Sequence, residues 1–175
     1  YRSLVYMAQE MEPSSKVMTK SRDLPKVAQP TGMDFIEFAV DKSEHQRLTG
    51  FLQKTGFAHV ATHKVKQVEL WQQGGIRLVI NRESQSFAQR YHTEHGLSVC
   101  AYGLSCPDVP GLIERATKLG YQIEYADPEC DTHGIAAITG PTGALLYLVD
   151  SSDPSPHWER EFNYHAVDPN SYLSR

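Results

Sequence analysis

The side chain with the clearest chemical potential is the carboxylate of Glu37, which lies in the stretch GMDFIEFAV at residues 32–40. The stretch alternates as a half-buried strand does, with Phe35, Glu37 and Ala39 on one face and Ile36, Phe38 and Val40 on the other. The second face is wholly apolar and predicts a helix packed against it. A lone carboxylate on the first face is costly to bury, so we expect Glu37 to be paired or protonated.

The candidate partner of this carboxylate is Arg77, in a predicted strand over residues 76–81. Ile76, Leu78 and Ile80 take one face of that strand, so Arg77 takes the other. There it could meet Glu37 across a cup, meaning the concave side of a curved sheet. We predict a structural ion pair between Glu37 and Arg77. The functional alternative is that Glu37 acts as a general acid or base.

Two residue pairs have a spacing that could place metal ligands on one strand face, namely Asp131 with His133 and His59 with His63. Imidazole and carboxylate groups bind several divalent metals. Such pairs arise easily among eight histidines. The pattern therefore does not favour a metal site at either pair.

The remaining candidate groups are two histidines and three cysteines. His92 and His95 are three residues apart and could share a helical turn, but we interpret them as part of a polar connector. Cys100 and Cys106 lie on or beside one predicted strand, too far apart for a disulfide, and are expected in the core. Three cysteines, the third being Cys130, without a secretion signal predict reduced thiols and a cytoplasmic location.

A β-α-β-β-β unit is predicted to position the first set of these residues. Its strand at 34–40 leads through an N-cap at Ser43 to a helix at 44–54, which Gly56 ends. Leu48, Phe51 and Leu52 are the expected buried stripe of that helix. Three strands follow, at 57–65, 67–72 and 76–81. The pair Gly74-Gly75 predicts the last hairpin turn.

The same order repeats in the second half of the chain, where Gly120 corresponds to Gly56 at an offset of 120 − 56 = 64 residues. The predicted strand at 97–105 precedes a helix at 109–119 and strands at 121–126, 134–139 and 144–149. We therefore predict an α+β fold with a duplicated unit, at residues 32–83 and 97–150. A generic α+β domain without internal symmetry is the alternative.

The flanking segments differ from the predicted domain, 32–150. Residues 1–11 predict a short helix left from a preceding domain, residues 12–31 a linker, and residues 151–175 an extension that packs on the sheet or on a partner. Because the chain starts at Tyr1, we expect a piece of a longer protein.

Composition excludes some partners. The formal net charge is −4 and basic residues form no block, which argues against nucleic acid or an anionic membrane. No apolar run is long enough to span a bilayer.

Four stretches in order resemble the vicinal oxygen chelate (glyoxalase-like) superfamily, and more closely the amino-terminal half of 4-hydroxyphenylpyruvate dioxygenases. They are GMDFIEFA at 32–39, QGGI at 73–76 with VIN at 79–81, HG at 95–96, and LLYLVD at 145–150. The resemblance implies that the two units curve into a half-open barrel with helices on its convex face. In this superfamily the concave face holds a metal.

The segment YRSLVY at 1–6 looks like the last helix of a sugar-phosphate-isomerase-type barrel. A barrel followed by a dioxygenase-like region is the arrangement of two-domain bacterial 3-dehydroshikimate dehydratases, which convert 3-dehydroshikimate to protocatechuate. The resemblance then implies a middle slice of such an enzyme. Its expected partners are the missing barrel, the missing carboxyl-terminal half and further copies of itself.

Read onto this sequence, the superfamily's metal-ligand positions are Phe35, Ala101 and Tyr147. Phenylalanine and alanine offer no ligand atom and tyrosine is a poor substitute, so we predict no metal, cofactor or catalytic residue in this chain. The resemblance implies a divalent metal in the missing parts of the parent. The expected role here is structural.

Three alternatives stay open. The parent could be a 4-hydroxyphenylpyruvate dioxygenase, with Fe(II) in its missing half. The chain could be a free-standing metalloenzyme. It could also be a glyoxalase-like binding module whose cup holds a small aromatic molecule against Trp71, Tyr102, Tyr121, Tyr125 and Tyr147.

Overall fold

The computed structural model describes residues 24–125, 135–153 and 156–167, and the helix predicted at 1–11 lies outside these ranges. The strands of the described part are β1 (Gly32–Ala39), β2 (Ala58–His63), β3 (Val68–Gln73), β4 (Ile76–Asn81), β5 (Ser98–Cys106), β6 (Ile123–Tyr125), β7 (Ala136–Thr139), β8 (Leu145–Asp150) and β9 (Phe162–Tyr164). The helices are α2 (Lys42–Lys54), α3 (Phe87–His95), α4 (Val109–Lys118) and α5 (His157–Glu161).

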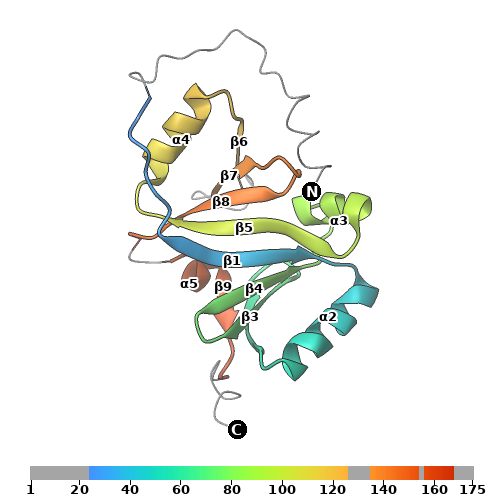
Figure 1. Ribbon diagram of the computed structural model, residues 1–175. Coiled ribbons are helices and arrows are strands. Elements are labelled where there is room, and N and C mark those ends of the chain that lie inside the picture. Colours follow the sequence, from blue (N-terminus) through green and yellow to red (C-terminus); the bar gives the residue numbers. More distant parts are fainter. Residues whose placement is uncertain (1–23, 126–134, 154–155, 168–175) are drawn as a thin grey trace, which may run out of the picture.

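These strands form one mixed sheet in the order β6-β7-β8-β5-β1-β4-β3-β2-β9 (Figure 1). Each unit has the same internal pairing, because β1 is parallel to β4 and β5 is parallel to β8. The two units join where β1 and β5 pair antiparallel at the centre of the sheet. Gly56 and Gly120 both adopt positive φ values, 94° and 87°, where they end the two equivalent helices. The predicted duplication is confirmed.

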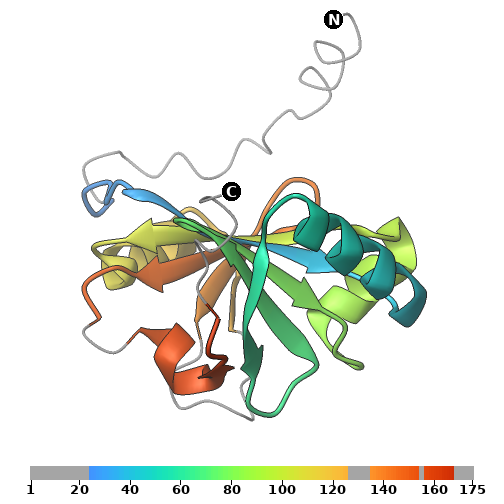
Figure 2. The ribbon, with the colours of Figure 1, turned by 90° about the horizontal axis from the view of Figure 1, so that it is seen from below.

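The sheet curves into a half-open barrel, as seen from below in Figure 2. The predicted alternation of β1 is confirmed. Ile36, Phe38 and Val40 pack in a cluster with Leu48 and Leu52 of α2, on the convex side. Phe35 and Ala39 belong to two clusters on the concave side.

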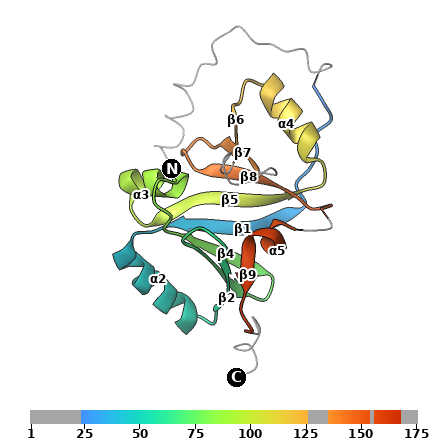
Figure 3. The same ribbon diagram turned by 180° about the vertical axis from the view of Figure 1, so that it is seen from behind.

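Two helices depart from the expected convex position. α3 contributes Phe87, Ala88 and Tyr91 to a concave cluster that contains Ala101. α5 contributes Trp158 to the other concave cluster, and β9 pairs with β2 at the edge of the sheet (Figure 3). The extension at 151–175, as far as it is described, therefore packs on the concave side. None of the helices in the described ranges is long and apolar enough to cross a bilayer.

The N-cap of α2 is Asp41 rather than the predicted Ser43. The Asp41 carboxylate accepts the backbone N–H of Glu44 at 2.8 Å, and the Glu44 carboxylate accepts the backbone N–H of Asp41 at 3.3 Å. This reciprocal capping box satisfies two amides that no single serine cap would reach. Ser43 donates its hydroxyl to Asp41 instead.

Helix α3 gives a direct test of capping, since the Ser86 hydroxyl accepts the backbone N–H of Gln89 at 3.1 Å. We expect Ser86→Ala to lower the free energy of unfolding by about 1 kcal/mol and Ser86→Gly by only a few tenths, because glycine is tolerated at an N-cap. Urea denaturation followed by circular dichroism measures both. The control is Ser84→Ala, whose exposed hydroxyl makes a long 3.4 Å contact to Glu83. Equal losses for the alanine variants at 84 and 86 would contradict the role of this cap.

Candidate functional site

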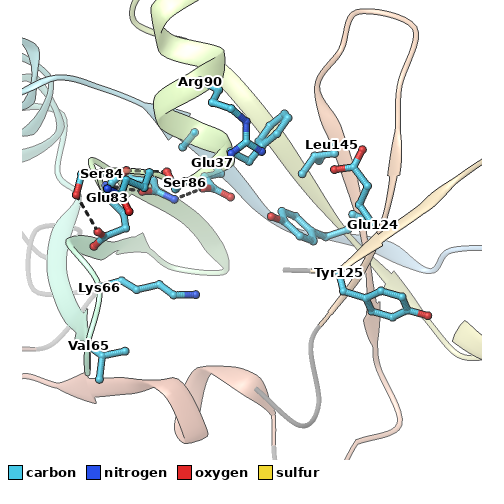
Figure 4. Close-up of a pocket in the computed structure, with 16 residues that line it drawn as sticks. Glu37, Val65, Lys66, Glu83, Ser84, Ser86, Arg90, Glu124, Tyr125 and Leu145 are labelled. Atoms are coloured by element: carbon cyan, nitrogen blue, oxygen red, sulfur yellow. Dashed lines mark hydrogen bonds between the residues drawn. The ribbon is translucent and has the colours of Figure 1, made fainter. Parts of the chain in front are cut away.

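The concave side of the sheet holds a cavity of about 560 Å³ between β1, α3, β6 and the β2–β3 hairpin (Figure 4). Its volume lies within the range of about 300–1,000 Å³ that is usual for small-molecule sites. Glu37 lies at its floor, Arg90 of α3 and Glu124 of β6 stand on its walls, and Lys66 points toward its middle.

Glu37 is 7% exposed and accepts a 2.7 Å hydrogen bond from the Asn81 side-chain amide. Burial raises the pKa of the Glu37 carboxyl, while this hydrogen bond and the charge of Lys66 act in the opposite direction. The predicted ion pair between Glu37 and Arg77 is therefore wrong, and the hydrogen bond from Asn81 takes its place. The parallel register sets Glu37 opposite Val79, two residues from both Arg77 and Asn81, and it is Asn81 that the carboxylate meets.

Arg77 instead forms an ion pair with Asp34, with 2.9 Å between Nη1 and Oδ1. The second oxygen of Asp34 accepts the indole N–H of Trp158 at 3.0 Å, and the Arg77 guanidinium lies 5.7 Å from the Trp158 ring. The arginine therefore helps to hold α5 against the sheet. Sequence reasoning missed Asp34 because it lies beside a register shift between Met33 and Phe35.

The three positions that the resemblance gives for the superfamily's metal site, Phe35, Ala101 and Tyr147, lie on β1, β5 and β8. The ring of Phe35 lies 5.8 Å from that of Tyr147, and Ala101 is fully buried beside Glu37. Burial raises the pKa of the Tyr147 phenol, which keeps it protonated and a weak ligand. A hydrocarbon ring, a methyl group and a neutral phenol do not fit a metal ion.

His59 and His63 do not come together as a pair of ligands in the part of the chain that the structure describes. A register shift between His59 and Ala61 places His59 against Trp71, with stacked rings 5.2 Å apart. His63 packs on Phe162 and accepts backbone N–H groups at Nδ1, so the two histidines face different surroundings. Asp131 and His133 lie outside the described residues.

His92 and His95 share a turn of α3, inside the predicted polar connector. His92 Nε2 contacts the Glu44 carboxylate at 2.6 Å. Asp41, Glu44 and His92 bring ligand atoms within 4.8 Å of one another, but these atoms already serve the capping box and its bond to α3. The cluster fastens α2 to α3.

The cysteines that the structure describes are core residues, as predicted. Cys100 and Cys106 are fully buried and unpaired with each other. Burial raises the pKa of both thiols, which disfavours the reactive thiolate. Of the five aromatic residues proposed for the cup, Tyr125 and Tyr147 line the cavity.

The buried carboxyl of Glu37 predicts a particular pH dependence of stability. Its pKa is raised above the unfolded value near 4.5, so the folded form retains a proton that the unfolded form loses. Stability from this group is complete below pH 4.5 and falls, by up to about 1.4 kcal/mol per pH unit, until the folded pKa is passed. We expect Glu37→Gln, which keeps an acceptor for Asn81, to flatten that fall. Urea unfolding between pH 4 and 9 measures it, and identical pH profiles of the two proteins would contradict it.

Sequence reasoning missed two other residues of the cup, Lys66 and His157. Lys66 lies in the turn between β2 and β3, where no periodic pattern of side chains marks a lysine as part of a site. His157 comes from α5, about 120 residues after β1, and no periodicity marks it. Lys66 and His157 come close to Glu37 only through the way the chain folds, which the sequence pattern does not show.

A family model described as hydroxyphenylpyruvate dioxygenase, HPPD, N-terminal matches residues 27–163, well over half of the chain. The 3-dehydroshikimate dehydratase of Pseudomonas putida is 36% identical over 129 residues, which cover 72% of this chain and 20% of that protein. The dehydratase of Pseudomonas aeruginosa is 35% identical over 85% of this chain and 24% of its own length. A 4-hydroxyphenylpyruvate dioxygenase from a Pseudomonas species is 37% identical over 68% of this chain and 33% of its length.

Solved structures agree with this assignment. A xylose isomerase-like TIM barrel/4-hydroxyphenylpyruvate dioxygenase fusion protein superposes with a TM-score of 0.75 and 30% identity, over 94% of this chain and 25% of that one. The methylmalonyl-CoA epimerase of Mycobacterium tuberculosis, at 16% identity and a TM-score of 0.52 over 75% of this chain and 95% of its own, shares the fold. The chain spans about a fifth to a third of its curated relatives named above. The family match and these relatives together show that the chain belongs to the HPPD N-terminal family of glyoxalase-like domains.

Proposed function

We propose that this chain is a non-catalytic, dioxygenase-like module of a larger metalloenzyme, and that the parent is a 3-dehydroshikimate dehydratase. The observation that carries the first part is the set Phe35, Ala101 and Tyr147, which offers no suitable ligand where the superfamily binds its metal. Two dehydratase relatives and the fusion structure with a TIM barrel support the second part. Dehydration and its divalent metal then belong to other parts of the parent.

The role left to the module is structural. It supplies an interface for the rest of the parent or for a second copy of it. Exposed apolar side chains outside the cup give it material for such contacts, among them Met33, Phe51, Ile76 and Tyr164, each more than half exposed.

The test uses the full-length parent, assayed for loss of water from 3-dehydroshikimate. We expect Phe35→Leu and Tyr147→Phe to leave kcat within about twofold of the unaltered enzyme, because neither residue touches the reacting atoms. Chelation of divalent metal is expected to abolish turnover without changing the urea midpoint of this module. A folded Tyr147→Phe enzyme with turnover reduced a hundredfold would overturn the proposal, as would chelation that unfolds the module.

A second candidate is the amino-terminal domain of a 4-hydroxyphenylpyruvate dioxygenase, favoured by the dioxygenase relative at 37% identity. Oxygen uptake by the full-length parent with 4-hydroxyphenylpyruvate separates the two. We expect no uptake above background. Uptake that requires Fe(II) would assign the parent to the dioxygenases.

A further inference from the structure

Residues 157–165, which comprise α5, β9 and His165, form a strap on the concave side of the sheet (Figure 3). The strap covers an inner chamber of about 110 Å³, and His157, Trp158 and Phe162 belong to the lining of that chamber. β9 attaches the strap to β2 through a ladder of three residue pairs. Short segments at the edge of a structure open locally at a lower free energy than its central strands. The strap is therefore the part of the cup where a separate opening is expected.

Histidines gather at the contact between this strap and the sheet. In the described part of the chain, His157 and His165 belong to the strap, and His59 and His63 belong to β2 beneath it. The ring of His165 lies 4.7 Å from that of His59, and the ring of His63 lies 5.2 Å from that of Phe162. Histidine is the side chain that ordinarily changes its charge between pH 5 and 8. The contact is therefore built from groups that titrate near neutrality.

His157 is held in the strap as a neutral ring. It is 6% exposed, and its Nε2 has no hydrogen-bond partner among the residues that the structure describes. Burial lowers the pKa of His157; the charges of Asp34 and Glu161 act in the opposite direction, and those of Arg160 and Arg77 lower it further. Both oxygens of Asp34 are already bonded, one to Arg77 at 2.9 Å and the other to an indole N–H of the strap at 3.0 Å. A proton on His157 would therefore create a poorly compensated buried cation.

His63 is fixed in a form whose Nδ1 accepts hydrogen bonds. That atom accepts the backbone N–H groups of Val65 and Lys66 at 3.2 Å and 3.1 Å, so a proton on it would break both bonds. Glu161 of the strap lies 3.7 Å from His63 Nε2 and acts in the opposite direction. Glu37 and Lys66 line the same inner chamber. Burial raises the pKa of Glu37, so its neutral form, which acid favours, also opposes the effect of the histidines.

His59 and His165 form a pair in which two positive charges are unfavourable. Thr62 Oγ1 lies 3.2 Å from His59 Nε2 and 3.0 Å from His165 Nε2, and its single hydroxyl proton can be donated to only one of them. Burial lowers the pKa of His59; the charge of Glu69 acts in the opposite direction, and the charges of His165 and His45 lower it further. Two protonated rings 4.7 Å apart repel each other and push the strap away from β2.

We infer that the strap is a pH-controlled closure of the cup, docked on the sheet when His59, His157 and His165 are neutral and released when they take up protons. Release opens the inner chamber to solvent. The pKa values of His59 and His157 lie below the unfolded value near 6.5, so the docked strap binds fewer protons than the released one. Docking is therefore strongest above pH 6.5 and weakens as the pH falls toward the folded pKa values. The inference does not depend on the identity of the parent.

The test is hydrogen–deuterium exchange of the 175-residue chain at pH 5.5 and 7.5, corrected for the intrinsic pH dependence of amide exchange. The reporter amides are those of His165 and Lys64, which donate to Val60 and Glu161 between the strap and β2. We expect their opening constant to rise about tenfold from pH 7.5 to pH 5.5. The central β1–β5 ladder is the internal reference, and its opening constant should stay level or fall, because acid protonates Glu37. An unchanged opening constant at the strap, or an equal rise in both ladders, overturns the inference.

Matched variants assign the proton sensitivity to the strap. His157→Phe removes a buried titrating ring, and His165→Gln removes the charge beside His59 while it keeps a hydrogen-bonding group for Thr62. Each should lower the tenfold change to about threefold, whereas His95→Gln, at an exposed position of α3, should leave it at about tenfold. A full tenfold change in both folded strap variants overturns the inference. If His157→Phe fails to fold, the imidazole titration of His157 in the unaltered chain, followed by nuclear magnetic resonance, decides. A midpoint below 6.5 supports the inference, and one at or above 6.5 overturns it.

Discussion

Replacing Trp158 by alanine is expected to reduce the free energy of unfolding by about 3–5 kcal/mol. Trp158 is 5% exposed, packs edge-on against Phe35 at 5.3 Å and lies 5.4 Å from Phe162. Its indole N–H donates to Asp34 at 3.0 Å. The truncation removes a large apolar surface, leaves a cavity on the concave side and loosens α5 from the sheet. Urea denaturation monitored by far-ultraviolet circular dichroism measures the loss.

Two companion variants test the indole hydrogen bond of Trp158 and the position of the aromatic side chain separately. Trp158→Phe keeps an aromatic ring but loses the indole N–H, so the expected loss is about 1–3 kcal/mol, for the unmade hydrogen bond to Asp34. Tyr164→Ala removes an aromatic side chain of the same segment that is 52% exposed, and should change stability by about 0.5 kcal/mol at most. Equal losses for Tyr164→Ala and Trp158→Ala would show that Trp158 does not anchor the segment.

The second large effect is expected at Gly103 of β5. A Cβ atom there would lie 2.3 Å from both Cδ1 and Cε1 of Phe35, far inside van der Waals contact. The Phe35 ring cannot move freely, because Tyr147 and Trp158 lie 5.8 Å and 5.3 Å from it. We expect Gly103→Ala to lose about 1–3 kcal/mol and Gly103→Val about 3 kcal/mol or more.

The control for a general glycine effect is Gly50 in α2, where an added Cβ meets no atom within 4 Å. Gly50→Ala should stabilise the protein by about 0.5–1 kcal/mol, since alanine is the better helix former. Combining Gly103→Ala with Phe35→Leu should recover about 1 kcal/mol relative to the sum of the single effects. Strict additivity of those two changes would rule out the proposed clash.

The sequence was most informative where a pattern depends on nearest neighbours along the chain. The alternation of Phe35 and Ala39 against Ile36 and Phe38 predicted both faces of β1, because strand geometry leaves no other choice. The repeated glycine stops predicted the duplication for the same reason. Within α2, however, Phe51 was expected to be buried and is 59% exposed, because the stripe of Leu48 and Leu52 already fills the contact with the sheet.

The cup was less predictable because its residues meet through register and chain path. Arg77 and Asn81 lie two residues to either side of Val79, which pairs with Glu37, and composition carries no information about which of them meets the carboxylate. The segment of helix α3 was expected only as a polar connector, and tertiary packing of Phe87 on the concave side determines the position of the helix. The approach of His157 depends on the path of the carboxyl-terminal segment.

The antiparallel contact between β1 and β5 has an implication for assembly. β1 is the first strand of the first unit and β5 is the first strand of the second. One unit expressed separately would therefore present this strand as an unpaired edge. That strand would pair antiparallel with the same strand of a second, identical polypeptide about a twofold axis. Two copies would then re-form the concave cavity. The present chain then resembles two such halves joined by a tether. Nicking the tether near Ser84 should yield two pieces that recombine on mixing.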